Sequence, residues 1–232
     1  MTTHSIDVLV IIAHPDDAEF GAAGTIGGWI EEGRSVGYVV CTNGDKGSGD
    51  RSVDPVELAR IRQEEQRAAA RTLGVSFVDF LGLPDQQLEE TAEFRELIVR
   101  QIRTYRPDIV VSTDPYRRYV WHRDHRILGQ VVVDASFPYA RDHLAYPDML
   151  AEGLEPHKVK ELYFFGTEDV NHQVDIAETF DLKLAALRCH VSQIEGIGGG
   201  NLEEWLRQRC RKHAQGSSFE LAEAFHTVVM PG

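Results

Sequence analysis

The sequence has little cysteine and no long apolar run. Its three cysteines, Cys41, Cys189 and Cys210, are unrelated in spacing and include no C-x-x-C pair. This argues against a disulfide framework and a thiolate zinc cage, and it favours a reducing compartment. No apolar stretch approaches the roughly 20 residues that span a bilayer, and the amino-terminal residues lack the basic region and cleavage site of a secretory signal. We therefore expect a soluble, unprocessed cytoplasmic protein without a membrane partner.

The chain also has few positively charged residues. The chain has 24 Lys and Arg against 37 Asp and Glu, so its formal net charge is −13. This charge argues against a nucleic-acid or anionic-membrane partner, because binding to a phosphate backbone requires a surplus of Lys and Arg. An anionic substrate would have to be bound by a local group of arginines, for which the candidates are Arg62, Arg117, Arg118 and Arg123.

Short β-rich runs alternate with longer amphipathic stretches along the chain. Strands are predicted at 7–13, 36–42, 76–81, 108–113 and 159–166, with an edge strand near 174–176. Helices are predicted at 22–32, 55–73, 91–105, 124–137, 177–193 and 202–213. This alternation predicts one α/β domain over residues 1–232, with a Rossmann-like, doubly wound and mainly parallel sheet and helices on both faces.

The first strand, VLVIIA, is apolar at every position, as a central strand covered on both faces must be. In a doubly wound sheet of strand order 3-2-1-4-5, the first and fourth strands are neighbours where the winding reverses. Ligands bind beyond the carboxyl ends of these strands. The residues that follow strands one and four should therefore meet in one crevice.

Two clusters of histidine and aspartate follow these two strands. His14-Pro15-Asp16-Asp17 comes after the first strand, and His122, Asp124 and His125 come after the fourth. Two histidines and one aspartate suit a catalytic zinc, which takes three protein ligands and keeps one position for water. Further carboxylates could take a proton from that water or orient an imidazole. The alternative for either cluster is a turn or helix cap, with Asp17 as the N-cap of the next helix.

The loop NGDKGSGD at 43–50 follows strand two and borders the same crevice. It could act as a lid or simply connect two elements.

At these motifs the chain resembles the PIG-L/LmbE-like family of zinc-dependent de-N-acetylases. HPDDAEFGAAGTI resembles the family's HPDD-x-E-x-G-x-G-G-T motif, and WHRDH resembles its H-P-D-H motif. TNGDKG, RQEEQRAAARTLGV with FLGLPD, and KLAALRCHVSQ extend the likeness over nearly the whole chain. Within the family, the motifs most resemble those of the N-acetylglucosaminyl deacetylases of thiol-cofactor biosynthesis.

The resemblance implies a role for each matching position. One zinc per chain would be held by His14, Asp17 and His125. Asp16 would be the general base on the zinc-bound water, His122 would stabilise the oxyanion, and Asp124 would orient His122. Arg62 falls where relatives anchor substrate, although Glu65 three residues later allows a surface ion pair instead. The family also implies a homo-oligomer, with a hexamer favoured.

Further positions near the crevice lie outside the residues that the two motifs assign. Asn43 borders it by topology and is a candidate for substrate binding, and Tyr119 could supply the tyrosine that some relatives use. Otherwise Asp16 would return the proton to the leaving amine. Trp121 and Arg123 depart from the usual second motif and are expected to narrow or charge the pocket. His190, near the end of a predicted helix, is expected to be a packed, hydrogen-bonded residue.

These observations predict a zinc-dependent hydrolase that removes an N-acetyl group from an amino sugar or its conjugate. The rivals are hydrolysis of another amide with a longer or aromatic acyl group, a metal-dependent phosphoester hydrolase, and a non-catalytic sugar- or nucleotide-binding module. A phosphoester hydrolase usually needs two metal ions about 3.5 to 4 Å apart.

Overall fold

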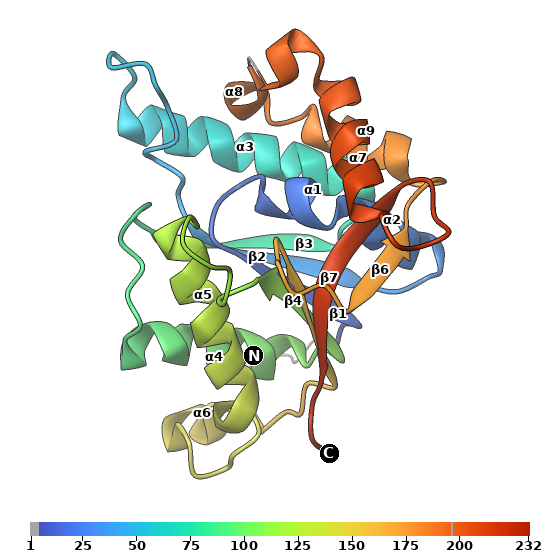
Figure 1. The fold of residues 1–232 in the computed structure, drawn as a ribbon. Helices are drawn as coiled ribbons and strands as arrows, with labels where there is room; N and C mark the ends of the chain where they lie inside the picture. Colours follow the sequence, from blue (N-terminus) through green and yellow to red (C-terminus); the bar gives the residue numbers. More distant parts are fainter. Residues whose placement is uncertain (1–4, 196) are drawn as a thin grey trace.

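The structure is a computed structural model and describes residues 5–195 and 197–232. A seven-stranded sheet runs through the middle of the molecule, with helices above and below it (Figure 1). The strands are β1 (Val8–Ile12), β2 (Val36–Thr42), β3 (Phe77–Leu83), β4 (Ile109–Thr113), β5 (Glu161–Phe165), β6 (His172–Asp175) and β7 (Ala222–Val229). Their order across the sheet is β3-β2-β1-β4-β5-β7-β6.

The first five strands are parallel and have the predicted order 3-2-1-4-5. β7 pairs antiparallel with β5 and with β6, so β6 forms the edge. The sheet is therefore mainly parallel, which confirms the predicted fold class. The edge strand was predicted, but β7 was not. Its sequence AEAFHTVV begins with alanine and glutamate, which have low β-propensity, and it is a strand because β5 offers it a partner.

The helices are α1 (Asp17–Gly21), α2 (Ala23–Glu31), α3 (Pro55–Leu73), α4 (Ala92–Tyr105), α5 (Arg123–Asp134), α6 (Pro147–Ala151), α7 (Phe180–Leu187), α8 (Val191–Ile194) and α9 (Leu202–His213), with a π-helical segment η1 (Ala135–Tyr139) and a 3₁₀ segment η2 (Ile197–Gly200). In Figure 1, α4, α5 and α6 lie below the sheet and the other helices lie above it.

The central strand β1 shows why the sheet is covered on both faces. All five of its residues are buried. Leu9 and Ile11 belong to the apolar cluster that packs against α4 and α5, whereas Val8, Val10 and Ile12 belong to the cluster that packs against α2 and α3. Because successive side chains of a strand point to opposite faces, an all-apolar strand needs a cover on each side.

Two predicted helices are interrupted. The helix expected at 22–32 begins earlier, at Asp17, and breaks at Ala22, whose φ of −145° is not helical. Gly21 packs so closely on the Phe165 ring that a Cβ there would lie 2.3 Å from it. The helix expected at 177–193 is divided into α7 and α8 around residues 188–190.

The three cysteines are free thiols, as expected. Among the described residues, no helix combines the length and the apolar character that crossing a bilayer requires.

Candidate active site

The two predicted clusters meet at the carboxyl ends of β1 and β4. These strands are neighbours in the sheet, and the winding reverses between them. His14 to Asp17 follow β1, and His122 to His125 lead into α5 after β4. The rings of His14 and His122 pack edge to face with their centroids 4.6 Å apart. Residues more than 100 positions apart in sequence thus form one polar site.

His14, Asp17 and His125 converge their donor atoms on one point. His125 Nε2 lies 2.9 Å from Asp17 Oδ1 and 3.1 Å from His14 Nδ1, and His14 Nδ1 lies 3.6 Å from Asp17 Oδ2. Tetrahedral zinc ligands at 2.0–2.1 Å would be about 3.3 Å apart. The donor set of two imidazoles and one carboxylate, and these separations, therefore fit a zinc ion. Asp17 is not the N-cap of α1, because Asp16 occupies that position and makes no side-chain cap.

The other nitrogen of His14 contacts two further carboxylates. Its Nε2 lies 3.0 Å from Asp85 Oδ1 and 3.3 Å from Asp124 Oδ2. Burial lowers the pKa of His14, but hydrogen bonds to Asp124, Asp17 and Asp85 outweigh it and hold that pKa well above its ordinary value. A carboxylate on the far nitrogen of a metal-binding imidazole fixes its ring orientation and raises its basicity. Asp85 also forms a second possible donor group with His14 and His122.

Asp124 contacts a different histidine from the one expected. Its carboxylate contacts His14 Nε2 and accepts hydrogen bonds from the backbone amides of Gln86 and Leu88, at 2.7 and 3.3 Å. The hydrogen bond between Asp124 and His122 involves the Asp124 backbone N–H, which donates to His122 Nδ1 at 3.2 Å. The expectation that the Asp124 side chain orients His122 is therefore wrong. The two residues are only two positions apart at the start of α5, and side chains at that spacing do not face each other.

His122 is the N-cap of α5, and its side chain is more exposed than those of His14 and His125. Burial lowers the pKa of His122, as do the neighbouring His14 and His125. Because Nδ1 accepts the Asp124 amide, the neutral ring carries its proton on Nε2. His122 therefore offers an N–H donor from Nε2.

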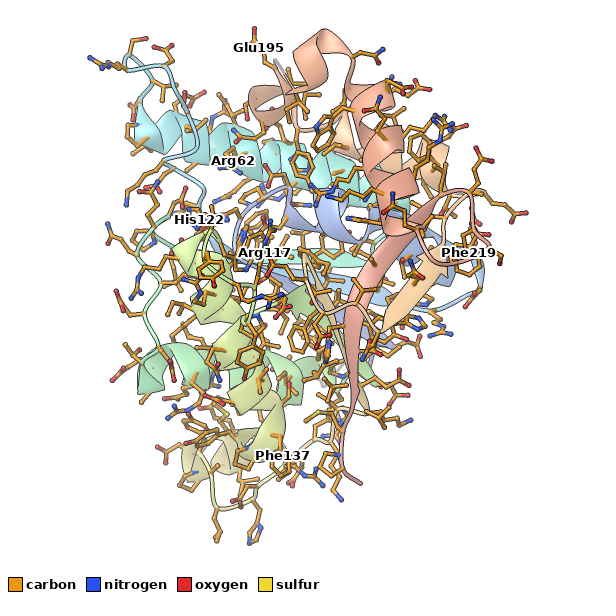
Figure 2. The ribbon with its side chains drawn as sticks, in the orientation of Figure 1. Arg62, Arg117, His122, Phe137, Glu195 and Phe219 are labelled. Carbon is orange, nitrogen blue, oxygen red and sulfur yellow. The ribbon has the colours of Figure 1, made fainter. Side chains whose placement is uncertain are left out.

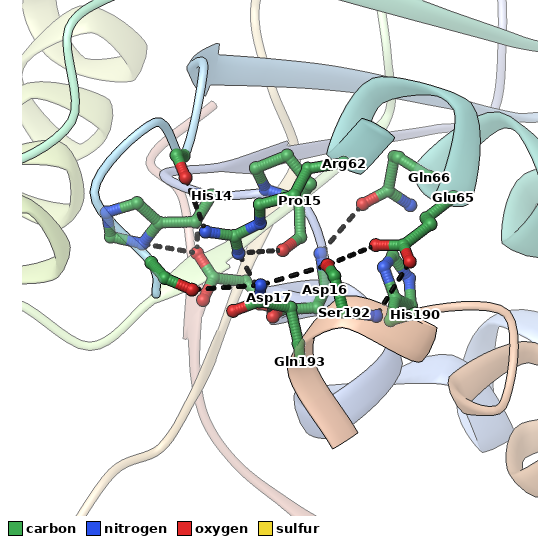
Figure 3. Close-up of polar contacts among 12 residues, drawn as sticks. His14, Pro15, Asp16, Asp17, Arg62, Glu65, Gln66, His190, Ser192 and Gln193 are labelled. Atoms are coloured by element: carbon green, nitrogen blue, oxygen red, sulfur yellow. Dashed lines mark hydrogen bonds and ion pairs between the residues drawn. The ribbon is translucent and has the colours of Figure 1, made fainter. Parts of the chain in front are cut away.

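Asp16 is held in an unusual backbone conformation. Its φ is +103°, a region that residues other than glycine seldom adopt, and its amide donates to Gln66 Oε1 at 2.9 Å (Figure 3). Its Oδ2 accepts a hydrogen bond from Arg62 at 3.1 Å. Burial raises the pKa of Asp16 to about 6, with Asp17 adding to the rise, while Arg62, His190 and His14 oppose it.

Behind Asp16 lies a buried polar chain that sequence reasoning missed. Gln66 Nε2 donates to both oxygens of Glu19, at 3.0 and 3.1 Å, and Glu19 Oε2 lies 3.1 Å from His190 Nε2. Gln66, Glu19 and His190 are each 0% exposed. His190 is the packed, hydrogen-bonded residue that was expected. The signal for Glu19 was present, because it is the glutamate of the first motif, and Gln66 lies one helical turn after Arg62.

Arg62 is buried, with 3% exposure, and its contacts are with the chain itself. Its NH1 donates to Gly44 O and its NH2 donates to Pro15 O and Asp16 Oδ2 (Figure 3). The surface ion pair with Glu65 is absent among the contacts of the described residues, because Glu65 binds Ser192 instead. The loop at 43–50 packs over Arg62 so tightly that a Cβ at Gly44 or Gly47 would collide with the guanidinium.

The other two candidates for substrate binding lie differently. Asn43 Nδ2 donates to Gly82 O at 3.3 Å, which ties the start of the 43–50 loop to β3. Tyr119 is 93% exposed and has a φ of +57°. Neither side chain contacts the histidine and aspartate cluster among the hydrogen bonds of the described residues.

Trp121 forms one wall of the site. Its ring lies 4.6 Å from the His125 ring, and its Nε1 donates to Asp114 O at 2.8 Å. Arg117 stacks on its face at 4.4 Å. Arg123 points away and pairs with Glu89 on the surface. Of the two departures in the second motif, Trp121 therefore packs directly against the site, whereas Arg123 pairs with Glu89 and adds no charge to it.

Asp85 is the other residue that sequence reasoning missed. It ends the FLGLPD stretch beyond β3, which extends to Leu83, two residues past the predicted strand end. The signal that could have found it is an aspartate just beyond a parallel strand, at the same edge as His14.

Comparison with known proteins shows similarity over nearly the full chain. The family model described as GlcNAc-PI de-N-acetylase (PIG-L) matches residues 9–136. Diacetylchitobiose deacetylase of Thermococcus kodakarensis is 35% identical over 221 residues, which cover 95% of this chain and 82% of that protein. A 1D-myo-inositol 2-acetamido-2-deoxy-alpha-D-glucopyranoside deacetylase of Mycobacteroides abscessus is 30% identical over 84% of this chain and 83% of its own.

The fold is similar to that of a solved deacetylase. The structure of N,N'-diacetylchitobiose deacetylase from Pyrococcus horikoshii, in complex with its inhibitor MPG, matches with a TM-score of 0.91 and 31% sequence identity. The match covers 97% of this chain and 84% of the other.

Proposed function

The chain belongs to the PIG-L family of de-N-acetylases, and from this premise we propose that it hydrolyses the N-acetyl amide of an amino sugar or amino-sugar conjugate, releasing acetate and a free amine. The observation that carries the proposal is the convergence of His14, Asp17 and His125 beside Asp16 and His122. The relatives are named as deacetylases of N-acetylated glucosamine compounds, which supports this substrate class.

His14, Asp17 and His125 would hold one zinc ion per chain. A bound zinc ion supplies Lewis acidity, which polarises a carbonyl and lowers the pKa of water to about 7. Asp85 and Asp124 hold the His14 ring from its Nε2 side, so that Nδ1 faces Asp17 and His125. Because Nε2 is engaged by these carboxylates, we propose a single metal ion rather than two that share His14.

Asp16 is the proposed general base. A pKa of about 6 leaves its carboxylate ionised near neutral pH and still basic enough to take a proton from the attacking water. Its partner Arg62 keeps the carboxylate in one orientation. Asp17 is occupied by His125 and by the backbone amide of His14, which leaves Asp16 as the free carboxylate of the pair.

His122 is the proposed stabiliser of the oxyanion. Its Nε2–H is available because Nδ1 is engaged by the amide of Asp124. A neutral donor aimed at the developing negative charge lowers the barrier without taking part in proton transfer. For the leaving amine, we propose that Asp16 returns the proton it accepted, because Tyr119 is 93% exposed and makes no side-chain hydrogen bond among the described residues.

The decisive experiment is Asp16→Asn, assayed for acetate release and for bound zinc. We expect hydrolysis to fall by about 100-fold or more, as for the loss of a general base, while zinc content stays unchanged. Loss of zinc would mean that Asp16 and Asp17 have exchanged roles. The substrate panel should contain N-acetylglucosamine, its disaccharides, glycosyl malates and inositols, and unrelated amides.

The rival functions make different predictions. Two zinc ions per chain would favour a phosphoester hydrolase. Faster cleavage of longer or aromatic amides than of N-acetyl sugars would favour another amide substrate. Tight sugar binding without turnover of any member of the panel would favour a binding module.

A further inference from the structure

A polar pocket of about 710 Å³ is lined in part by Arg117 and Gly166, both of which contact the Trp121 ring. It is lined by the loop between β5 and β6, the carboxyl end of α9 and the start of β7, and by Arg117 from the segment after β4. The residues that matter here are Arg117, Gly166, Glu168, Arg209, Lys212 and His213. Neither the sequence motifs nor the proposed deacetylation uses this pocket.

The charge of the pocket is opposite to that of the chain. Arg117, Arg209 and Lys212 line it in a protein whose formal net charge is −13. Glu168 is the one carboxylate among the lining residues, and it is bound by Arg118, whose Nε lies 3.1 Å from Glu168 Oε2. Burial, together with Arg209 and Lys183, lowers the pKa of His213 to about 4, so its ring is neutral near pH 7. The pocket therefore has unneutralised positive charge.

The two guanidinium groups lack acceptors. Within residues 5–195 and 197–232, the side chains of Arg117 and Arg209 make no hydrogen bond or ion pair, and the Nε atom of each is buried without a partner. Burial lowers the pKa of Arg209 and the positive charge of Arg117 lowers it further, whereas Cys210 and the Glu223 carboxylate oppose this. The buried Arg103 differs in that its Nε and NH2 donate to four backbone carbonyl groups, so that only its NH1 is buried without a partner. Buried donors without acceptors are costly, so a ligand that supplies acceptors would be favoured.

Aromatic rings hold both guanidinium groups in place. Arg117 lies 4.4 Å from the centre of the Trp121 ring, and Arg209 lies 5.7 Å from that of Trp205. Such stacking orders an arginine without satisfying its N–H groups. The donors are thus positioned before any ligand arrives.

The Trp121 side chain connects the pocket with the proposed active site, because it contacts Arg117 and Gly166 of the pocket lining and also His125. One end of the indole packs over Gly166, where a Cβ would lie 2.8 Å from the ring, and the ring also contacts His125 at 4.6 Å between centroids. In Figure 2 Arg117 lies to the right of His122, near the middle of the molecule. A group bound between Arg117 and Arg209 would therefore lie one indole ring away from the proposed metal ligand.

We propose that this pocket is an oxyanion site, which binds a phosphate or carboxylate group through Arg117, Arg209 and Lys212. The planar guanidinium fork matches two oxygens of such a group. The site goes beyond the proposed deacetylation and does not depend on it. The anion is either part of the substrate, attached to its amino-sugar portion, or a free ion that binds next to Trp121.

Titration calorimetry with inorganic phosphate tests the site. The full chain should bind phosphate at one saturable site, and Arg209→Gln should weaken that binding about tenfold or more, the loss expected for a hydrogen bond to a charged group. Arg211→Gln is the matched control, because Arg211 is on the same helix, is half exposed and faces Glu220 instead of the pocket. It should change the affinity less than about twofold. Absence of saturable binding, or equal weakening in both variants, would overturn the proposal.

Thermal melting provides a second readout, which guards against a variant that misfolds. Phosphate should raise the Tm of the wild-type protein and of Arg211→Gln, and should raise it less in Arg209→Gln and Lys212→Gln. Without phosphate, Arg209→Gln should melt no lower than the wild type, because it removes a partly buried charge that has no hydrogen-bond or ion-pair partner in the described part of the chain. A large loss of stability in Arg209→Gln without phosphate would show that Arg209 is structural and would overturn its role here.

Whether the anion is part of the substrate or a free ion can be tested by measuring kcat/KM for N-acetylglucosamine and for its 6-phosphate. If the substrate carries the anion, Arg209→Gln should lower kcat/KM for the phosphorylated sugar relative to the neutral one by about tenfold. If the anion is a free ion, that ratio should not change and phosphate should still bind; either result supports the site. Phosphate binding without any deacetylation would refute the proposed function and leave the oxyanion site standing.

Discussion

Replacing Gln66 by methionine tests whether a buried amide supports the backbone of Asp16. Gln66 Oε1 accepts the Asp16 amide at 2.9 Å, and its Nε2 donates to both oxygens of Glu19. Methionine has similar length and volume and would fill the same space, so the change removes the polar contacts without opening a large cavity. The Asp16 amide and the Glu19 carboxylate would each lose a partner in a region without solvent.

The magnitude follows from these lost contacts. A buried donor without a partner costs about 1–3 kcal/mol, and a hydrogen bond to a charged group contributes about 1.5–3 kcal/mol. The free energy of unfolding should therefore fall by about 2.5–6 kcal/mol. Because Asp16 has a φ of +103°, loss of this support should let its backbone relax, and displacement of its carboxylate by about 1 Å should lower kcat about 100-fold.

The assay combines urea denaturation with kcat measured on the best substrate. Gln63→Met is the matched control, because Gln63 is on the same helix, is partly buried, and makes no side-chain hydrogen bond within the described part of the chain. It should change stability by less than about 0.5 kcal/mol. If Gln66→Met and Gln63→Met have the same stability and the same kcat, the proposed support of Asp16 is wrong.

The remaining predictions concern metal, pH and a buried ion pair. A chelator should abolish hydrolysis and added zinc should restore it, and His125→Ala should lower the zinc bound per chain; full zinc content in that variant would remove His125 from the ligand set. Since burial raises the pKa of Asp16 to about 6 and only its ionised form accepts a proton, kcat/KM should fall as the pH drops through about 6. A profile that stays flat there would exclude Asp16 as the base. Glu223→Gln breaks a buried pair with Lys183, 2.6 Å apart, and should lower the free energy of unfolding by about 3–5 kcal/mol in chemical denaturation. The exposed Glu220→Gln should change it by less than about 0.5 kcal/mol, and equal losses would contradict the role of the pair.

The sequence predicted where the histidine and aspartate clusters lie in the fold, but it did not predict which side chains contact each other. His14 to Asp17 and His122 to His125 were expected at one crevice, and their side chains do meet. The predicted Asp124–His122 contact is wrong, because the Asp124 carboxylate is turned to His14 and anchored by the amides of Gln86 and Leu88. Those amides belong to the loop after β3, and no pattern in the sequence shows how that loop folds back.

Two arginines show that the sequence also does not predict how side chains on a helix pack. Arg62 and Arg209 both lie on amphipathic helices, and spacing alone suggests exposed cations for each. In the fold, Arg62 is covered by the loop at 43–50 and binds Asp16, whereas Arg209 is turned into a pocket beside Trp121 and lacks an acceptor. Only the packing of neighbouring elements gives acceptors to the terminal nitrogens of Arg62, while the Nε atoms of both arginines are buried without a partner.

By itself the sequence determined the parallel core of the sheet and the edge at which the polar clusters meet. An all-apolar β1 requires cover on both faces, and alternating helices with right-handed crossovers leave few other strand orders. The tertiary structure decided which carboxylate contacts which imidazole, that β7 joins the sheet, and that Gln66 and Asp85 belong to the site. The physical reason is the distance along the chain over which each signal acts. Periodicity and helix caps depend on residues a few positions apart. These contacts join loops and helices that are distant in sequence, so they depend on how those elements pack.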